Sequence, residues 1–179
     1  MREDVKEILF SEEQISDKVK ELADRISRDY KDKNLLVVGV LKGSVLYAAE
    51  LIKNITVPCE IDFMAESSYG NSTETSGVVR ILKDLDHSIE GKDILIVEDI
   101  VDSGVTLDYL LKYLKARKAN SINITTLLNK EARRKVDIDV KYVGFEVPDE
   151  FIVGYGIDYA EKYRNLPFIG ILKPEVYER

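Results

Sequence analysis

The chain has 179 residues, of which 45% are hydrophobic and 33% charged, and its formal net charge is −7. This length fits one domain with a substantial core, and the acidic balance argues against a nucleic-acid-binding protein that relies on a generally basic surface. The single cysteine Cys59, the lack of a long apolar run and the charged N-terminus argue against a disulfide framework, a membrane span and a secretory signal, so we expect a cytoplasmic protein without membrane or nucleic-acid partners.

The first predicted element is an amphipathic helix over residues 12–30. Ser11 and Gln14 have the spacing of a capping box, in which each side chain satisfies a backbone N–H group of the other. Apolar residues then recur at helical spacing: Ile15, Val19, Leu22 and Ile26. We expect this stripe to pack on the core of the protein.

The rest of the chain alternates short apolar segments with helical patterns. Strands are predicted over residues 35–41, 61–65, 78–82, 94–97, 122–128, 140–145 and 169–172, and helices over residues 44–52 and 105–116. The polar, glycine-bounded segment 67–77 is typical of a loop. This alternation predicts an α/β fold with a mainly parallel, twisted sheet that is flanked by helices.

The most informative segment is residues 94–107. Four apolar residues run into Glu98 and Asp99, and Asp102 then opens a turn that contains Ser103 and Gly104 before the next helix. Ligands of open α/β sheets bind at the carboxyl ends of strands. A turn that opens a helix can present N–H groups and hydroxyls to a phosphate. We therefore predict a cation or sugar diol at the acids and a phosphate monoester at the turn.

Two common classes with acidic strand ends do not fit. A P-loop enzyme requires G-x-x-x-x-G-K-[ST], whereas residues 39–44 place Lys42 before Gly43. A receiver domain would have its acid pair after the first strand. The order acid-acid-x-x-Asp-Ser-Gly-x-Thr remains as the specific signal.

With this order the chain resembles the type I phosphoribosyltransferases, and most closely the hypoxanthine-guanine phosphoribosyltransferases of bacteria. Three other segments carry the resemblance: Leu-Lys-Gly-Ser at 41–44, Ser-Ser-Tyr-Gly at 67–70 and the segment 151–159. The likeness extends over about residues 8–177. It implies a single domain with a core of about residues 35–145 and a small hood from about 1–12 and 146–179.

The resemblance implies a Mg²⁺-dependent transfer of phosphoribose from 5-phosphoribosyl 1-diphosphate to hypoxanthine or guanine, giving IMP or GMP and pyrophosphate. Glu98 and Asp99 match the residues beside the ribose hydroxyls and the metal. Asp102 matches the general acid/base placed against N7 of the purine. The matching residues for ribose and 5′-phosphate are Glu98, Asp99, Asp102, Ser103, Gly104, Val105, Thr106 and Leu107.

The other matches divide among three roles. Lys42, Gly43 and Arg164 match pyrophosphate contacts, with a non-proline cis peptide implied between Leu41 and Lys42. Ser68 and Tyr69 match a lid over the reacting centre. The implied purine contacts are Lys130, Phe151, Ile152 and Asp158, and Asp158 is also an implied metal ligand. Judged without the resemblance, Phe151 could be a core residue, and Asp158 with Arg164 a surface ion pair.

The sequence departs from some relatives at two places. Ile152 stands where valine is common, which changes little chemically, whereas residues 131–134 after Lys130 affect base preference more than reaction type. A transferase for another base, such as xanthine or a pyrimidine, is one alternative. A nucleotide-sensing, RNA-binding regulator on the same fold is the other, although the acidic balance and Asp102 argue against it. The resemblance also implies a homodimer or homotetramer. His87, the only histidine, lies in a polar turn and matches no family role.

Overall fold

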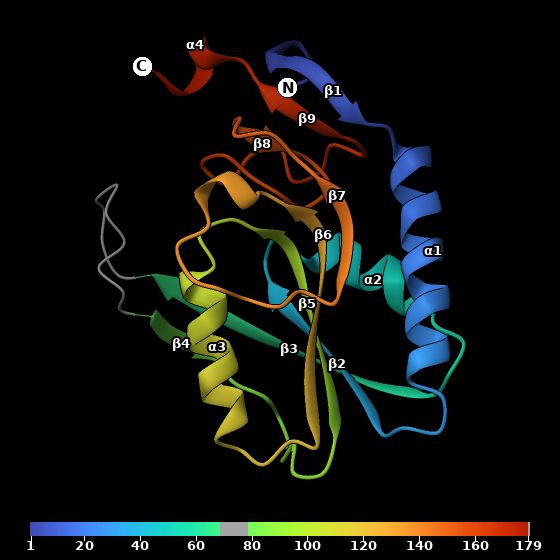
Figure 1. Ribbon diagram of the computed structural model, residues 1–179. Helices are drawn as coiled ribbons and strands as arrows, with labels where there is room; N and C mark the ends of the chain where they lie inside the picture. The colour runs from blue at the N-terminus through green and yellow to red at the C-terminus, as the bar shows by residue number, and fades with distance from the viewer. Residues whose placement is uncertain (69–78, 179) are drawn as a thin grey trace.

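The computed structural model describes residues 1–68 and 79–178, and its centre is a six-stranded sheet (Figure 1). The strand order is β4-β3-β2-β5-β6-β7, and every neighbouring pair is parallel except β3 and β4. The strands are β2 (Leu35–Leu41), β3 (Cys59–Ser68), β4 (Val79–Lys83), β5 (Asp93–Val101), β6 (Ser121–Asn129) and β7 (Tyr142–Glu146). The predicted α/β fold with a mainly parallel sheet is confirmed.

Helices cover both faces of this sheet, with α1 (Glu12–Asp29) and α2 (Val45–Asn54) on one face and α3 (Val105–Lys115) on the other (Figure 1). Successive strand residues point to opposite faces, so Leu95 packs beneath α1 and α2 whereas Ile94 packs with α3. This explains the uninterrupted apolar strand segments. Among the described residues, no helix is long and apolar enough to cross a membrane.

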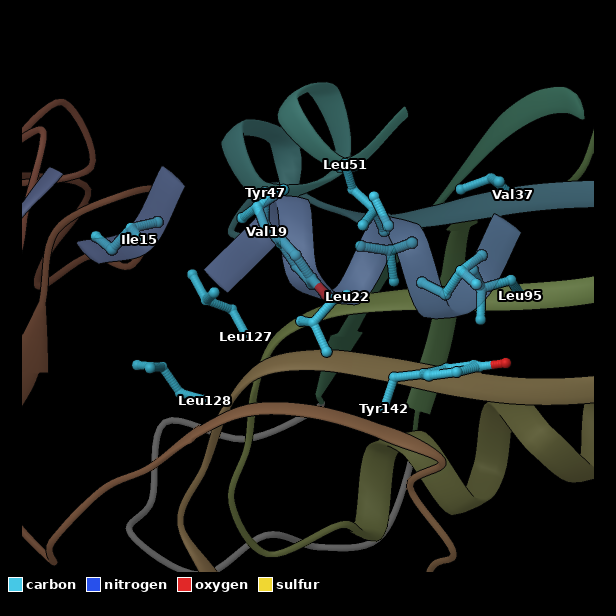
Figure 2. Close-up of a cluster of buried hydrophobic side chains, with 14 of the residues drawn as sticks. Ile15, Val19, Leu22, Val37, Tyr47, Leu51, Leu95, Leu127, Leu128 and Tyr142 are labelled. Atoms are coloured by element: carbon cyan, nitrogen blue, oxygen red, sulfur yellow. The ribbon is translucent and has the colours of Figure 1, made fainter. Parts of the chain in front are cut away.

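The core under α1 is built from the stripe that the sequence predicts. Ser11 accepts a hydrogen bond from the Gln14 N–H group, and the Gln14 side chain accepts one from Ser11, so the capping box is present. Leu22 is fully buried beside residues of α2 and the sheet (Figure 2). Full burial of a leucine side chain contributes roughly 1.5–3 kcal/mol. Tyr47 of α2 also shares a 2.6 Å hydrogen bond with Thr125 of β6, which ties the helix layer to the sheet.

A second, three-stranded sheet joins the two ends of the chain, in the order β1-β9-β8. Its strands are β1 (Val5–Phe10), β8 (Ile152–Val153) and β9 (Ile169–Leu172), and both pairings are antiparallel. The remaining short elements are η1 (Arg2–Asp4), η2 (Glu131–Arg133) and α4 (Pro174–Tyr177). Figure 1 shows this sheet above the carboxyl end of the main sheet, close to the segment that carries Phe151.

Two strand ends that position the site differ from their predictions. The sequence predicts strands that end at Ala65 and Val97, but β3 continues to Ser68 and β5 continues to Val101. The pairing of β5 with β2 ends at the Gly39–Val97 pair, whereas its pairing with β6 runs on to the Val101–Asn129 pair. Beyond Val97, the part of β5 that carries Glu98 and Asp99 is therefore held by backbone pairing with β6 alone. Glu98 and Asp99 therefore lie where the sheet opens between β2 and β5.

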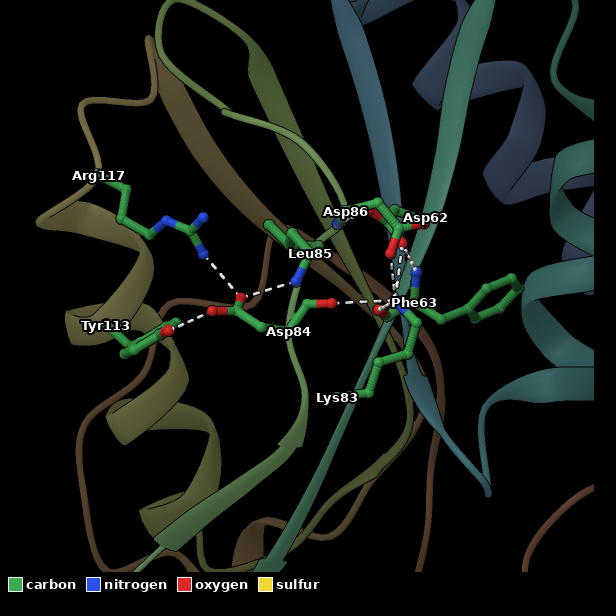
Figure 3. A network of polar contacts seen from close by, with 8 residues as sticks. All are labelled: Asp62, Phe63, Lys83, Asp84, Leu85, Asp86, Tyr113 and Arg117. Carbon is green, nitrogen blue, oxygen red and sulfur yellow. Dashed lines mark hydrogen bonds and ion pairs between the residues drawn. The ribbon is translucent and has the colours of Figure 1, made fainter.

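A polar network holds the end of β4 against α3 (Figure 3). The Asp84 carboxylate accepts hydrogen bonds from the Tyr113 hydroxyl at 2.5 Å and from the Arg117 guanidinium at 2.7 Å. The Lys83 ammonium group donates to Asp62 at 3.2 Å and to the Phe63 carbonyl at 2.9 Å. These contacts fix the end of β4 to β3 and to α3, the helix that follows Glu98 and Asp99 in the sequence.

Candidate active site

An acidic pocket of about 210 Å³ lies over the end of β5. Its lining includes most of the predicted ribose and phosphate residues: Glu98, Asp99, Asp102, Ser103, Gly104, Thr106 and Leu107. Val105 is the exception, since it does not line this pocket. Gly104 has φ +80° and immediately precedes α3, so the turn exposes the first N–H groups of the helix, which have no intrahelical acceptor.

The carboxylates of this pocket repel one another. Burial raises the pKa of Asp99 to about 6. Burial, and then the charges of Asp99 and Glu66, raise the pKa of Glu98 well above its usual range. In the described part of the chain, no group of three or more His, Cys, Asp or Glu side chains is arranged to hold a metal alone. Uncompensated carboxylates in a pocket fit a hard cation such as Mg²⁺ that takes its remaining ligands from substrate and water.

Glu66 is a pocket residue that the sequence reading missed. It lies on β3, lines the acidic pocket, and has a pKa raised by burial and by Asp99. Only the pairing of β3 beside β2 brings it near the acids of β5. No local sequence pattern distinguishes it from other strand glutamates.

A second pocket of about 310 Å³ adjoins the first and brings together the predicted purine residues. Lys130 is only 6% exposed, and its ammonium group donates to the Glu150 carbonyl at 2.9 Å. Burial lowers the pKa of this lysine. Phe151 is 37% exposed and stacks on Tyr177 with ring centroids 4.7 Å apart, so it is not a core residue. Ile152 and Asp158 also line this pocket.

Asp102 lies at the junction, because it lines both pockets. One of its carboxylate oxygens, Oδ1, is buried and has no hydrogen-bond partner. A buried acceptor without a partner costs free energy. Because the protein leaves this acceptor unsatisfied, the Asp102 carboxylate is free to accept a hydrogen bond or a proton from a ligand that spans the two pockets.

The predicted pyrophosphate residues come together beside the acidic pocket. The peptide bond between Leu41 and Lys42 is cis. A Cβ atom on Gly43 would lie 1.9 Å from Asp99 Oδ2, so only glycine fits against this carboxylate. Arg164 donates to the Gly156 carbonyl at 2.8 Å, and Glu161 pairs with both Lys42 at 3.0 Å and Arg164 at 3.2 Å.

The model of the phosphoribosyl transferase domain matches residues 6–160. The chain belongs to the phosphoribosyl transferase family.

The proteins similar to this chain include named enzymes and solved structures. This phosphoribosyltransferase is 58% identical to the hypoxanthine-guanine phosphoribosyltransferase of Bacillus subtilis, over 99% of both chains. It is 55% identical to the enzyme of that name from Staphylococcus epidermidis, over the whole of both chains. A solved hypoxanthine phosphoribosyltransferase from Staphylococcus aureus superposes with a TM-score of 0.97 at 54% identity, covering 100% of this chain and 97% of that one.

The roles of Asp158, Ser68 and Tyr69 in this phosphoribosyltransferase stay predictions. Asp158 is not part of a three-residue metal group within the described residues; it pairs with Arg164 at 3.1 Å and accepts from the Glu161 N–H group. Ser68 is the last residue of β3. Tyr69 lies outside the described residues.

Proposed function

We propose that this phosphoribosyltransferase transfers the 5-phosphoribosyl group from 5-phosphoribosyl 1-diphosphate to hypoxanthine or guanine in purine salvage, giving IMP or GMP and pyrophosphate. Asp102 carries the proposal: one carboxylate lines both pockets, and its buried oxygen has no protein partner. Transfer between two substrates requires a group of this kind where they meet. The names of the similar proteins from Bacillus subtilis and Staphylococcus aureus support the same chemistry.

The phosphoribosyl end is assigned to the acidic pocket. The hydroxyls of Ser103 and Thr106 and the N–H groups around Gly104 bind the 5′-phosphate, which also interacts favourably with the N-terminus of α3. Val105 and Leu107 complete this turn through their backbone. Glu98 and Asp99 hold the ribose hydroxyls and the Mg²⁺ ion, and when bound the ion neutralises charge on the diphosphate.

The departing pyrophosphate is assigned to Lys42, the Gly43 backbone and Arg164. Two cations beside the leaving group stabilise the negative charge that grows on it. In the ligand-free protein both cations pair with Glu161. On binding, Lys42 and Arg164 would exchange this carboxylate for the pyrophosphate.

The base is assigned to the second pocket. Phe151 stacks on the purine, and the Lys130 ammonium group donates to its O6 atom. Ile152 offers backbone groups to the base edge, and Asp158 is a further contact at that edge or to the metal. Asp102 takes the proton that must leave the ring as the new bond forms, a step to which a positioned carboxylate contributes about 10²–10⁴-fold.

Water must be kept from the positively charged transition state. We assign this role to a lid that includes Ser68, the last residue of β3, and Tyr69, which follows it in the sequence. The three-stranded sheet serves as the hood, and Leu172 of β9 donates a 2.8 Å hydrogen bond to the Phe151 carbonyl, which holds this aromatic residue over the pocket.

We further propose that the protein is a cytoplasmic homodimer or homotetramer. Leu46 of α2 is 38% exposed and lines a groove with Tyr155, Leu166 and Pro167. The preceding residue, Val45, is 40% exposed. An exposed apolar patch of this kind favours contact with another copy of the chain. Sedimentation velocity of the wild-type protein and of Leu46→Glu tests this, since the variant should shift towards monomer.

The reaction is tested by incubating the protein with Mg²⁺, phosphoribosyl diphosphate and one base at a time, followed by chromatography of the products. We expect IMP from hypoxanthine and GMP from guanine, each with one equivalent of pyrophosphate. Product from xanthine or uracil alone would favour the other-base alternative. Absence of any product, together with RNA binding, would favour the regulatory alternative.

A further inference from the structure

Arg134 lies in the segment after Lys130, and its guanidinium group joins two parts of the site. Its Nε atom donates to the Asp102 carbonyl at 3.1 Å, and its Nη2 atom donates to Asn129 Oδ1 at 2.5 Å. Asn129 immediately precedes Lys130 and is itself hydrogen-bonded to both oxygens of Glu146, at 3.1 and 3.0 Å. One side chain therefore connects the backbone of the junction carboxylate to the strand end that bears the buried lysine.

The same segment supports the phosphate turn from beneath. A Cβ atom at Gly104 would lie 3.2 Å from Arg134 Cδ and 2.9 Å from Ile138 Cδ1, so the arginine stem fills the space behind this glycine. The Lys135 N–H group donates to the Ser103 carbonyl at 2.9 Å. The turn is held by side-chain packing as well as by hydrogen bonds.

The position of the Asp102 carboxylate depends on this support. Its Oδ1 atom has no hydrogen-bond partner in the protein, so no hydrogen bond orients that oxygen. The direction of the side chain therefore depends on the backbone at Asp102, whose carbonyl accepts a hydrogen bond from Arg134. An error of about 1 Å in the placement of a reacting group can cost about 10²-fold in rate.

We propose that Arg134 is a positioning residue that sets Asp102 relative to Lys130 and the phosphate turn, and so acts on the chemical step through Asp102. The inference rests on the proposed function. Lysine cannot replace arginine fully here, because a single ammonium group lacks the planar set of donors that reaches two acceptors in fixed directions. Methionine keeps most of the stem but donates no hydrogen bond.

A double-mutant cycle tests the proposal. Three substitutions are each made in the wild-type and Asp102→Asn backgrounds: Arg134→Met, Arg134→Lys and the control Lys115→Met. The control removes a positive charge from an exposed position of α3. IMP formation from radiolabelled hypoxanthine gives kcat and KM. In the wild-type background we expect Arg134→Met to lower kcat about 10- to 100-fold, with a smaller change in KM, Arg134→Lys to be intermediate and Lys115→Met to be unchanged.

The Asp102→Asn background separates positioning from general structural support. With no acid/base group left to position, Arg134→Met should lower the remaining turnover less than about twofold. An equal loss in both backgrounds, or wild-type kcat for Arg134→Met, would overturn the inference. Thermal unfolding checks that the variants fold, and if Arg134→Met does not, Arg134→Lys is judged by the same comparison. Absence of product from the wild-type protein would instead overturn the proposed function.

Discussion

Replacing Asp102 by asparagine tests the acid/base role with the least change in shape. The substitution keeps the side-chain volume, and Oδ1 has no hydrogen-bond partner in the protein to lose. General acid/base catalysis contributes about 10²–10⁴-fold, which is roughly 2.7–5.4 kcal/mol at 1.36 kcal/mol per tenfold change. We expect kcat to fall by this factor. The KM for phosphoribosyl diphosphate should stay within about threefold, because the substitution leaves unchanged Ser103, Thr106 and the turn N–H groups, to which we assign its phosphate.

The assay follows IMP formation from hypoxanthine by absorbance under saturating Mg²⁺. The matched control is Asp137→Asn, which removes one exposed carboxylate from the segment after Lys130 and should leave kcat unchanged. Wild-type kcat in Asp102→Asn would refute the acid/base role. A large rise in the KM for phosphoribosyl diphosphate with kcat preserved would show that Asp102 acts in binding instead.

Three further predictions follow from the contacts around the site. Gly43→Ala should raise the KM for phosphoribosyl diphosphate more than about tenfold in steady-state kinetics, because the added Cβ would meet Asp99 Oδ2 at 1.9 Å. Without Mg²⁺, Asp99→Asn should stabilise the protein to urea much more at pH 8 than at pH 4. Burial raises the carboxyl pKa from 3.8 to about 6, so the cost of ionising this carboxyl in the folded state grows between these two values and is complete above pH 6. Asp84→Asn should lower the free energy of unfolding in urea by about 1–3 kcal/mol while kcat is kept, because it weakens the hydrogen bonds from Tyr113 and Arg117.

The elements with strong local signals could be predicted from the sequence. The segment 35–41 is a buried strand with the predicted bounds, and the capping box at Ser11 starts a helix at Glu12. Local chemistry decides both, because continuous apolar residues suit a strand covered on two faces and Ser and Gln satisfy the first N–H groups of a helix. The acids, the turn at Gly104 and Lys130 also lie in one site, as the resemblance implies.

Features that depend on distant partners could not be predicted. The strand β1 is rich in charge and short, and it exists because it pairs with β9, more than 150 residues later. The extension of β5 beyond Val97 depends on its pairing with β6. Glu66 and Arg134 reach the site only through the packing of β3 and of the segment after β6. The burial of Lys130 also depends on distant packing, so a single lysine after a strand does not predict it from the sequence.

The most direct test of the account compares hypoxanthine with adenine as the acceptor base in the wild-type protein. In the proposed assignment, the buried Lys130 ammonium group donates to O6 of hypoxanthine, whereas adenine would present an amino group at that position and leave this donor unpaired. Sites that depend on a hydrogen bond to the substrate discriminate by about 10⁴-fold or more when it is lost. We predict that kcat/KM for hypoxanthine exceeds that for adenine by at least about 10³-fold. Comparable values for the two bases, or no nucleotide from hypoxanthine, would contradict the assignment of this pocket to a 6-oxopurine.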